Sequence, residues 1–190
     1  MEAQTPGAQS LARIEGPNLT LRLITLDDAA YVHGLRSNPA YNRYLSEVRG
    51  SVEDQRAWIE SYKAREASLS ELYYVIERKD HLRCGLVRLY NIGHESFTWG
   101  SWILDENKPR KAALESIVLS FSVGFDRLNC DDAVLDVRIE NHHARAFYTR
   151  FGIMETHRTD QDIYFIYPKS MFKADRDGFL ALLSSEALKC

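Results

Sequence analysis

A tyrosine and an asparagine on one predicted strand–helix unit are the side chains best placed to do chemistry. The stretch 136–152 reads DVRIENHHARAFYTRFG, and apolar and polar residues alternate into it, which predicts a half-buried strand. Asn141 favours a helix N-cap, and Gly152 suits a left-handed helix stop. Between them, apolar residues recur at the spacing of one helix face: Ala144, Phe147, Tyr148 and Phe151. Tyr148 therefore faces inward, where its phenol can donate a proton or pack as a core aromatic.

These spaced residues resemble a motif of a known family. The pattern Asn-x-x-Ala-x-x-Phe-Tyr-x-x-Phe-Gly, which starts at Asn141 and ends at Gly152, is similar to the acceptor-side motif of the GNAT N-acetyltransferases. The resemblance implies that acetyl-CoA is the cosubstrate, that Asn141 contacts coenzyme A, and that Tyr148 protonates the departing thiolate. An ordinary packed strand–helix unit is the alternative interpretation of the same residues.

A basic segment before a long predicted helix stands where that family holds the coenzyme A pyrophosphate. The resemblance implies that backbone N–H groups of this loop and of the helix start bind the phosphates. Lys111 occupies the position of the family's central glycine, and Pro109 removes one N–H donor. We expect the basic side chains to compensate by charge, and the alternative is a solvated basic turn. The predicted cofactor-binding residues of this loop are Lys108, Arg110, Lys111, Ala112 and Ala113.

Acetyl transfer also needs a donor that polarises the thioester carbonyl and a base for the amine. The resemblance places a backbone N–H near Ile103 or Leu104 against that carbonyl. Glu95, in the turn before this predicted strand, is one candidate base, and an ordered water that relays to bulk solvent is another. An amine with a pKa nearer ~8 than ~10.4 needs little help, which favours a sugar amine or a protein N-terminus over a lysine side chain.

The predicted acceptor site draws on two parts of the chain. The segment LRSNPAYNRYL resembles a stretch that lines the acceptor pocket in the GNAT branch of ribosomal-protein N-terminal and amino-sugar acetyltransferases. A plain helix–turn–helix corner is the alternative. Aromatic side chains elsewhere could stack on a base or a sugar. The predicted substrate-binding residues are Arg36, Asn38, Tyr41, Tyr90 and Trp99.

Composition and charge favour one globular domain that acts on a small molecule or a protein terminus. The 190-residue chain is 45% hydrophobic and 11% aromatic, which supports a sizeable core. A net charge of -3 argues against broad binding to nucleic acid or membrane surfaces. No apolar run approaches the ~20 residues of a membrane span, and the N-terminus lacks the features of a secretory signal. Three scattered cysteines indicate a reducing compartment, so we expect a cytoplasmic protein without structural disulfides.

The predicted order of elements is that of a mixed α/β sheet. Residues 1–17 are expected to be a flexible leader, 18–170 the GNAT domain, and 171–190 a C-terminal helix or tail that packs on the domain or on a second copy in a homodimer. Three short strands with tight turns predict an antiparallel meander, and a strand–helix–strand order follows it. The resemblance implies the GNAT fold, with a mostly antiparallel central sheet of about seven strands and about four helices. His142 and His143 are expected to be exposed helix-start residues and no metal site is predicted.

Three functions stay open on the sequence alone. The first is transfer of the acetyl group of acetyl-CoA to a primary amine of a nucleotide-linked amino sugar, because the layout resembles that of the pseudaminic-acid pathway acetyltransferases. The second is a protein N-terminal acetyltransferase of the ribosomal-protein type, which should show an acidic or open peptide groove. The third is a degenerate, non-catalytic GNAT that binds a ligand or partner, which the altered loop favours.

Overall fold

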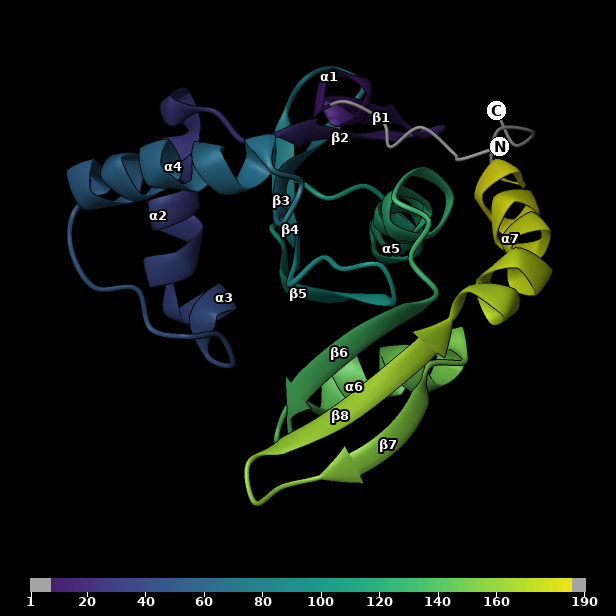
Figure 1. The fold of residues 1–190 in the computed structure, drawn as a ribbon. Helices are drawn as coiled ribbons and strands as arrows, with labels where there is room; N and C mark the ends of the chain where they lie inside the picture. The colour runs from purple at the N-terminus through teal and green to yellow at the C-terminus, as the bar shows by residue number, and fades with distance from the viewer. Residues whose placement is uncertain (1–7, 186–190) are drawn as a thin grey trace.

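Eight strands form one sheet in residues 8–185, the part of the chain that this computed structural model describes (Figure 1). The strands are β1 (Arg13–Glu15), β2 (Leu19–Leu23), β3 (Leu72–Arg78), β4 (Arg83–Tyr90), β5 (Ser96–Leu104), β6 (Asp132–Arg138), β7 (Met154–Arg158) and β8 (Asp162–Pro168). They lie in the order β1-β2-β3-β4-β5-β6-β8-β7, and among these neighbours only β5 and β6 run parallel. The mixed, mostly antiparallel sheet that the sequence predicts is thus confirmed.

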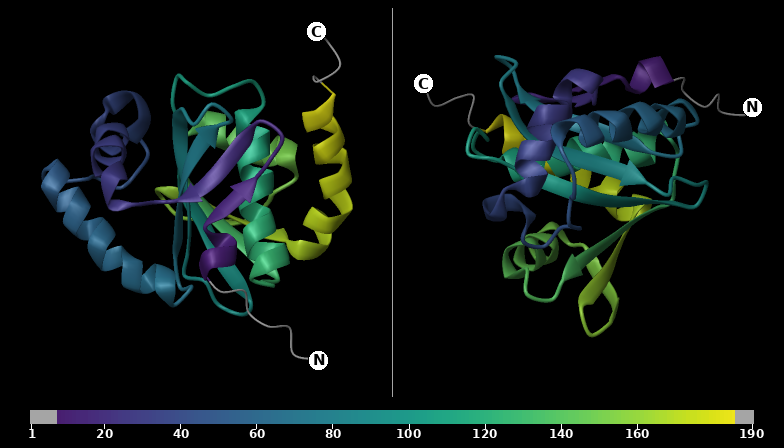
Figure 2. Two further views of the ribbon diagram at one scale, coloured as in Figure 1. Left: turned by 90° about the horizontal axis from the view of Figure 1, so that it is seen from above. Right: turned by 90° about the vertical axis from the view of Figure 1, so that its left-hand side faces the viewer.

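Helices cover both faces of this sheet. They are α1 (Ala8–Leu11), α2 (Ala29–Ser37), α3 (Pro39–Asn42), α4 (Val52–Ala67), α5 (Ala112–Ser122), α6 (His142–Phe151) and α7 (Lys169–Ser184). A 3-10 turn (Leu26–Asp28) precedes α2, and a π-helical turn (Val123–Arg127) extends α5. Figure 2 shows α2 and α4 on one face, and α5 and α7 on the other. None of the helices between residues 8 and 185 has both the length and the apolar character needed to cross a bilayer.

The N-terminal segment is more ordered than the sequence predicts. Residues 1–17 are expected to be a flexible leader, yet α1 and β1 lie inside this range, and β1 pairs antiparallel with β2. The prediction is wrong for this part because Leu11 and Ile14 are buried in the core, and a three-residue strand leaves little periodicity to detect. β1 also raises the strand count above the predicted seven. Residues 1–7 of the predicted leader and 186–190 of the predicted tail lie outside the described residues.

Two hydrophobic layers hold the helices against the sheet. One lies between the sheet and α5, α6 and α7, and edge-to-face aromatic pairs dominate it. Its fully buried rings include Phe97, Phe121, Phe125, Tyr167 and Phe172. The other lies under α2 and α4 and includes Val32, Ile59, Tyr62, Tyr73 and Leu86. Burial of each such side chain contributes about 1.5–3 kcal/mol, so the two layers fix the helices on which the site depends.

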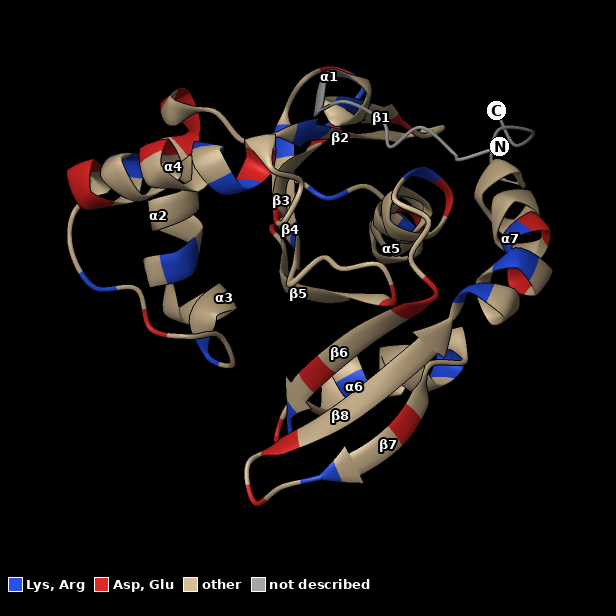
Figure 3. Ribbon diagram, in the orientation of Figure 1, with Lys and Arg blue, Asp and Glu red and all other residues tan. Residues whose placement is uncertain are grey.

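Charged residues of both signs are spread over the outer helices. Figure 3 shows Lys or Arg and Asp or Glu side by side on α4 and on α7. Charges of both signs are typical of a solvated surface, whereas a surface that binds nucleic acid concentrates positive charge.

Local sequence determines where two important helices begin and end. Ser51 caps α4: its hydroxyl accepts from the Asp54 N–H at 3.3 Å, and the Asp54 carboxylate accepts from the Ser51 N–H at 2.7 Å. Asn141 caps α6 by accepting from the Ala144 N–H at 3.2 Å, and Gly152 ends α6 with φ 89°. Both caps are confirmed as predicted.

The strands β5 and β6 diverge along their length. They pair only where Ser96–Thr98 lies beside Asp132–Val134, and no further register pair joins them. β5 is also irregular here, because Leu86 pairs with Ile103 while Arg88 pairs with Gly100, which leaves one extra residue on β5. Ser101 in this bulge has φ 48°. A gap therefore opens between the carboxyl-terminal halves of the two strands.

A buried carboxylate, Glu115, fastens α5 to the start of β2. Its Oε1 atom accepts from the backbone N–H groups of Asn18 and Leu19, each at 2.7 Å, and its Oε2 accepts from the Asn18 side-chain amide at 2.9 Å. Gly16 lies close by, and a Cβ there would come within 2.5 Å of the same carboxylate. Charge-assisted hydrogen bonds to a buried acceptor are stronger than neutral ones, so Glu115 sets the distance between α5 and the edge of the sheet.

We expect Glu115→Ala to lower the free energy of unfolding by about 1–3 kcal/mol, because the buried Leu19 N–H loses its acceptor. Glu115→Gln should cost less, since its carbonyl oxygen can still accept from both backbone N–H groups. Urea unfolding of the three proteins measures this order. Equal stability of Glu115→Ala and wild type would mean that the carboxylate does not hold α5 in place.

Candidate active site

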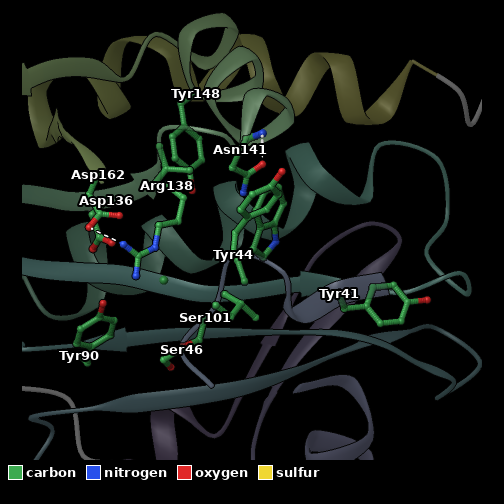
Figure 4. A pocket seen from close by; sticks show the side chains of 15 residues that line it. Tyr41, Tyr44, Ser46, Tyr90, Ser101, Asp136, Arg138, Asn141, Tyr148 and Asp162 are labelled. Atoms are coloured by element: carbon green, nitrogen blue, oxygen red, sulfur yellow. Dashed lines mark hydrogen bonds and ion pairs between the residues drawn. The ribbon is translucent and has the colours of Figure 1, made fainter. Parts of the chain in front are cut away.

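A cavity of about 310 Å³ occupies the gap between β5 and β6 (Figure 4). We call it the cleft. The bulge of β5, the last residues of β6, the start of α6 and the loop after α3 supply its walls. Figure 4 shows that side chains from these separate elements converge on it. The divergence of two strands thus creates a hollow that passes through the sheet.

Tyr148 reaches the cleft from α6. Its ring is held edge-on by Trp99 and Phe165, with ring centroids 6.2 and 5.4 Å away, and the residue is only 5% exposed. Among the described residues, none forms a hydrogen bond with its hydroxyl. Burial, followed by the charge of Asp136 and by Tyr90, raises the pKa of Tyr148 above its ordinary value. The phenol therefore keeps its proton at neutral pH and leaves it available to a reacting group.

Asp136 reaches the cleft from the other face of the sheet. Along β6, Ala133, Leu135 and Val137 are buried while Asp136 points to the exposed face. Although Asp136 is exposed by its surface area, the protein atoms around its carboxyl group displace part of its water and raise its pKa, and the neighbouring carboxylate of Asp162 raises it further. A carboxylate with a raised pKa holds a proton more readily than an ordinary one and is therefore suited to act as a general base.

Arg138 limits the negative charge beside Asp136. Its guanidinium lies 3.2 Å from the Asp162 carboxylate and also donates to Gln161 at 2.8 Å. It lowers the pKa of Asp136, against the effect of burial and of Asp162. Neither Asp136 nor its neighbours Arg138 and Asp162 are predicted as site residues. The signal that could have found Asp136 is a carboxylate on the polar side of the strand that leads into the Asn141–Gly152 motif.

A second hollow adjoins the cleft near the start of α5. Tyr41, Trp102, Asn141 and Ala144 line both spaces, and the second one continues along Ile103, Leu104 and Ala113 to Phe147. We call it the cofactor groove. The structure thus brings the predicted residues Ile103, Leu104, Ala113 and Asn141 together. It places Ala112 next to them as a buried residue at the start of α5.

The start of α5 fits a phosphate group. Among the described residues, no acceptor is bonded to the backbone N–H groups of Ala113 and Leu114, at the beginning of this 11-residue helix. Such free donors at the positive end of a helix dipole form a ready anion site. Lys108 is exposed beside them, and its ammonium donates to the Asp105 carbonyl at 3.3 Å. Arg110 is also exposed on this loop.

Lys111 has the backbone conformation that glycine adopts most easily, with φ 61° and ψ 9°. Its side chain, however, does not turn to the groove. The ammonium donates to the Leu182 carbonyl and to the Ser185 hydroxyl at 3.2 Å, near the end of α7. The prediction that Lys111 replaces a glycine by adding charge to the phosphate site is therefore wrong, because the last turn of α7 supplies carbonyl acceptors that bind this ammonium.

The structure divides the predicted acceptor residues. Tyr41 and Tyr90 line the cleft, whereas Asn38 is exposed and caps α3 by accepting from the Ala40 N–H at 2.9 Å. Arg36 lies in a neighbouring cavity. Trp99 cannot stack on a ligand: it is 1% exposed, and its indole N–H donates to the Ser120 hydroxyl at 2.8 Å.

The tryptophan that lines the cleft is Trp102, and not Trp99 as the sequence predicts. Strand alternation turns Trp99 inward, and the bulge of β5 presents Trp102 to both the cleft and the cofactor groove. Its indole N–H donates to the Ser116 hydroxyl at 3.1 Å, which fixes the ring. The bulge that separates the two tryptophans has no clear mark in the sequence.

Glu95 does not lie at the cleft. Its side chain is exposed at the start of β5, and its carbonyl accepts from the Asp131 and Asp132 N–H groups, each at 3.0 Å. Gly100, which lines the cleft, is five residues further along the strand, or roughly 17 Å at ~3.3 Å per residue. The prediction of Glu95 as base therefore fails on position, and the carboxylates that line the cleft are Asp136 and Asp162.

Comparison with known proteins agrees with this arrangement. Residues 18–154 match the family described as the acetyltransferase (GNAT) domain. The chain is 35% identical to a solved structure described as apo FdhC, a nucleotide-linked sugar GNAT, with a TM-score of 0.81 over 88% of this chain and 96% of that chain. No match is found among curated protein sequences.

Two further solved structures share the fold. A spermidine N-acetyltransferase from Vibrio cholerae, in complex with CoA and spermine, has a TM-score of 0.73 at 23% identity, over 83% of this chain and 99% of that one. A GCN5-related N-acetyltransferase from Brucella melitensis has a TM-score of 0.75 at 18% identity, over 92% of this chain and 86% of that one. On the family match over 18–154 and the 35% identity to a solved GNAT structure, the chain belongs to the GNAT family and is an acetyl-CoA-dependent N-acetyltransferase.

Proposed function

We propose that this enzyme acetylates the primary amine of a nucleotide-linked amino sugar. The observation that carries the proposal is the cleft, in which the unpaired Tyr148 hydroxyl and the Asp136 carboxylate enter from opposite faces of the sheet. The 35% identity to a nucleotide-linked sugar GNAT supports this class of acceptor. Aromatic rings in the cleft, those of Tyr44, Tyr90 and Trp102, suit a sugar ring or a base.

The two faces of the sheet have different roles in this proposal. Acetyl-CoA supplies the activated acetyl thioester from the cofactor groove, where the N–H groups at the start of α5 are placed to bind its phosphates. The acceptor enters from the face that α2 and α4 cover. Asp136 takes one proton from the ammonium group of the acceptor, and the neutral amine attacks the carbonyl carbon of the thioester. As the carbon–sulfur bond breaks, Tyr148 gives its proton to the departing thiolate, and the second proton of the attacking nitrogen passes to the Tyr148 phenolate.

A protein N-terminus or a polyamine is the competing acceptor. Asp136 and Asp162 could hold a cationic group, and an acidic groove is what an N-terminal acetyltransferase should show. Arg138 contacts Asp162, however, and removes part of that negative charge. Turnover with nucleotide-linked amino sugars, spermidine and short peptides, each at several concentrations, tests the proposed acceptor directly. A higher kcat/KM for spermidine or a peptide would overturn it.

Tyr148→Phe should lower kcat by about 10²- to 10⁴-fold, the usual contribution of a general acid. Because none of the described residues bonds to the hydroxyl, the melting temperature and the affinity for acetyl-CoA should stay close to wild type. Steady-state kinetics, calorimetric titration and thermal melting of one preparation check all three. An unchanged kcat with a lower melting temperature would instead identify Tyr148 as a core residue only.

Asp136→Asn should lower kcat/KM by about 10²-fold or more near neutral pH, where the acceptor amine is protonated and needs a base. The loss should shrink at about pH 9.5, because solvent then deprotonates an amine with a pKa of ~8. In the wild type, kcat/KM should fall as the pH drops through the raised pKa of Asp136.

Asp162→Asn is the matched control for this experiment. It removes the charge that raises the pKa of Asp136, so the acid limb of the pH profile should move to lower pH while activity at neutral pH is largely kept. If Asp136→Asn lowers kcat/KM by the same factor at every pH, Asp136 is not the general base and only binds the acceptor.

Lys111→Gly should bind acetyl-CoA as tightly as wild type or more tightly, because glycine adopts φ 61° without the cost of about 1–3 kcal/mol that other residues incur. Lys111→Ala keeps that cost and loses the contact with α7, so its affinity should fall several-fold. Calorimetric titration at two salt concentrations measures both. If Lys111→Gly binds acetyl-CoA more weakly than wild type, and the difference disappears at high salt, then the Lys111 ammonium does attract the phosphates by its charge.

A further inference from the structure

A cavity lined by arginines lies beside the cleft on the face of the sheet that α2 and α4 cover. Its volume is about 360 Å³, and its walls include Arg36, Arg49, Arg88, Ser46 and Trp58. We call it the arginine cavity. Ser46 lines both the cleft and this cavity. The two spaces therefore adjoin at Ser46.

Strand β4 links the two spaces. Arg88 lines the arginine cavity, and Tyr90, two residues further and thus on the same face, lines the cleft. The Arg88 guanidinium lies 4.8 Å from the centroid of the Tyr90 ring and 5.4 Å from that of Trp58. The distance along the strand from one side chain to the other is about 7 Å.

Among the described residues, no carboxylate forms an ion pair with the positive charge of Arg36. Its guanidinium donates to the Ser46 hydroxyl at 2.7 Å and to the Ser46 carbonyl at 3.2 Å. The buried Nε–H lies close to the buried hydroxyl of Tyr73, and the charge of Arg36 lowers the pKa of that tyrosine against the effect of burial. An anionic group from a ligand in the cavity would therefore stabilise the guanidinium through its charge.

The acidic residues nearby already have other partners. Glu71 is shared between two guanidiniums, with Arg88 at 2.6 Å and Arg65 at 2.7 Å. Asp54 accepts from the Ser51 N–H and hydroxyl in the cap of α4. Glu47 pairs with Arg49 on the surface at 2.9 Å. Glu47 and Asp54 also line the cavity, but the three lining arginines, Arg36, Arg49 and Arg88, outnumber these two carboxylates. The cavity therefore retains positive charge, and it favours an anion over a polyamine.

We propose that the arginine cavity binds the phosphate groups of the acceptor, so that the amine of the same molecule reaches Asp136 and Tyr148 in the cleft. This inference rests on the proposed function and specifies where its nucleotide phosphates bind. Guanidinium groups match phosphate oxygens in geometry and charge, and the Arg36 guanidinium lines the cavity without a carboxylate partner among the described residues. The sugar ring then lies over Tyr90, between the two spaces.

The test is calorimetric titration of the protein with thymidine diphosphate and with uridine diphosphate. Saturating coenzyme A is present, so that the phosphate site at α5 is occupied. Wild type should bind at least one of the two, and Arg36→Gln should bind it about 10- to 100-fold more weakly, the range for a lost charged hydrogen bond. The KM for nucleotide-linked amino sugars should rise by a similar factor, while the KM for acetyl-CoA stays unchanged.

Two further variants keep the result interpretable. Arg36→Lys retains the charge and should keep part of the affinity. Arg56→Gln makes the same substitution on α4, at an exposed arginine that donates to the Leu26 carbonyl, and should match wild type. A melting temperature and an acetyl-CoA affinity equal to those of wild type show that Arg36→Gln is folded.

The outcomes separate this inference from the proposed function. If wild type acetylates a nucleotide-linked amino sugar but Arg36→Gln does so with the same KM, the phosphates bind elsewhere and the inference is wrong while the function stands. Absence of diphosphate binding to wild type in the presence of coenzyme A would likewise overturn the inference alone. If wild type acetylates spermidine or a peptide and no nucleotide-linked amino sugar, both are wrong.

Discussion

The divergence of β5 and β6 is the constraint on which the rest of the structure depends. The two strands pair over Ser96–Thr98 and Asp132–Val134 and then separate, and the extra residue in β5 lies in the separated part. A parallel pair that opens in this way leaves a passage through the sheet. A side chain from α6 and a side chain from the opposite face can then meet at one point, which a fully paired sheet would prevent.

The passage joins two faces of the sheet that carry different groups. On the α5 face lie the backbone N–H groups at the start of α5, which have no acceptor among the described residues, and the apolar groove along Ile103, Leu104 and Phe147. The other face carries Asp136 and, further along β4, the arginines. Tyr148 and Asp136 both line the cleft between the two faces. In the proposed reaction each substrate would therefore approach from its own face.

The ends of the chain support this arrangement in different ways. Glu115 binds the start of β2 and sets the position of α5. At the far end, the last turn of α7 accepts the ammonium of Lys111. Lys111 can therefore adopt a left-handed conformation while its charge is satisfied away from the groove. The loop keeps its shape without a glycine because the side chain gains contacts that offset part of the backbone cost.

The sequence by itself determined the features that local periodicity and capping encode. These are the meander, the strand before Asn141, the inward face of Tyr148, the caps at Ser51 and Asn141, and the stop at Gly152. Only the tertiary structure decided which side chains meet. The bulge of β5 places Trp102 rather than Trp99 at the cleft, and the length of β5 keeps Glu95 away from it. The last turn of α7 binds the Lys111 ammonium away from the start of α5. Asp136 lines the cleft because β5 diverges from β6, and the sequence of β6 alone does not show where its neighbouring strand separates from it.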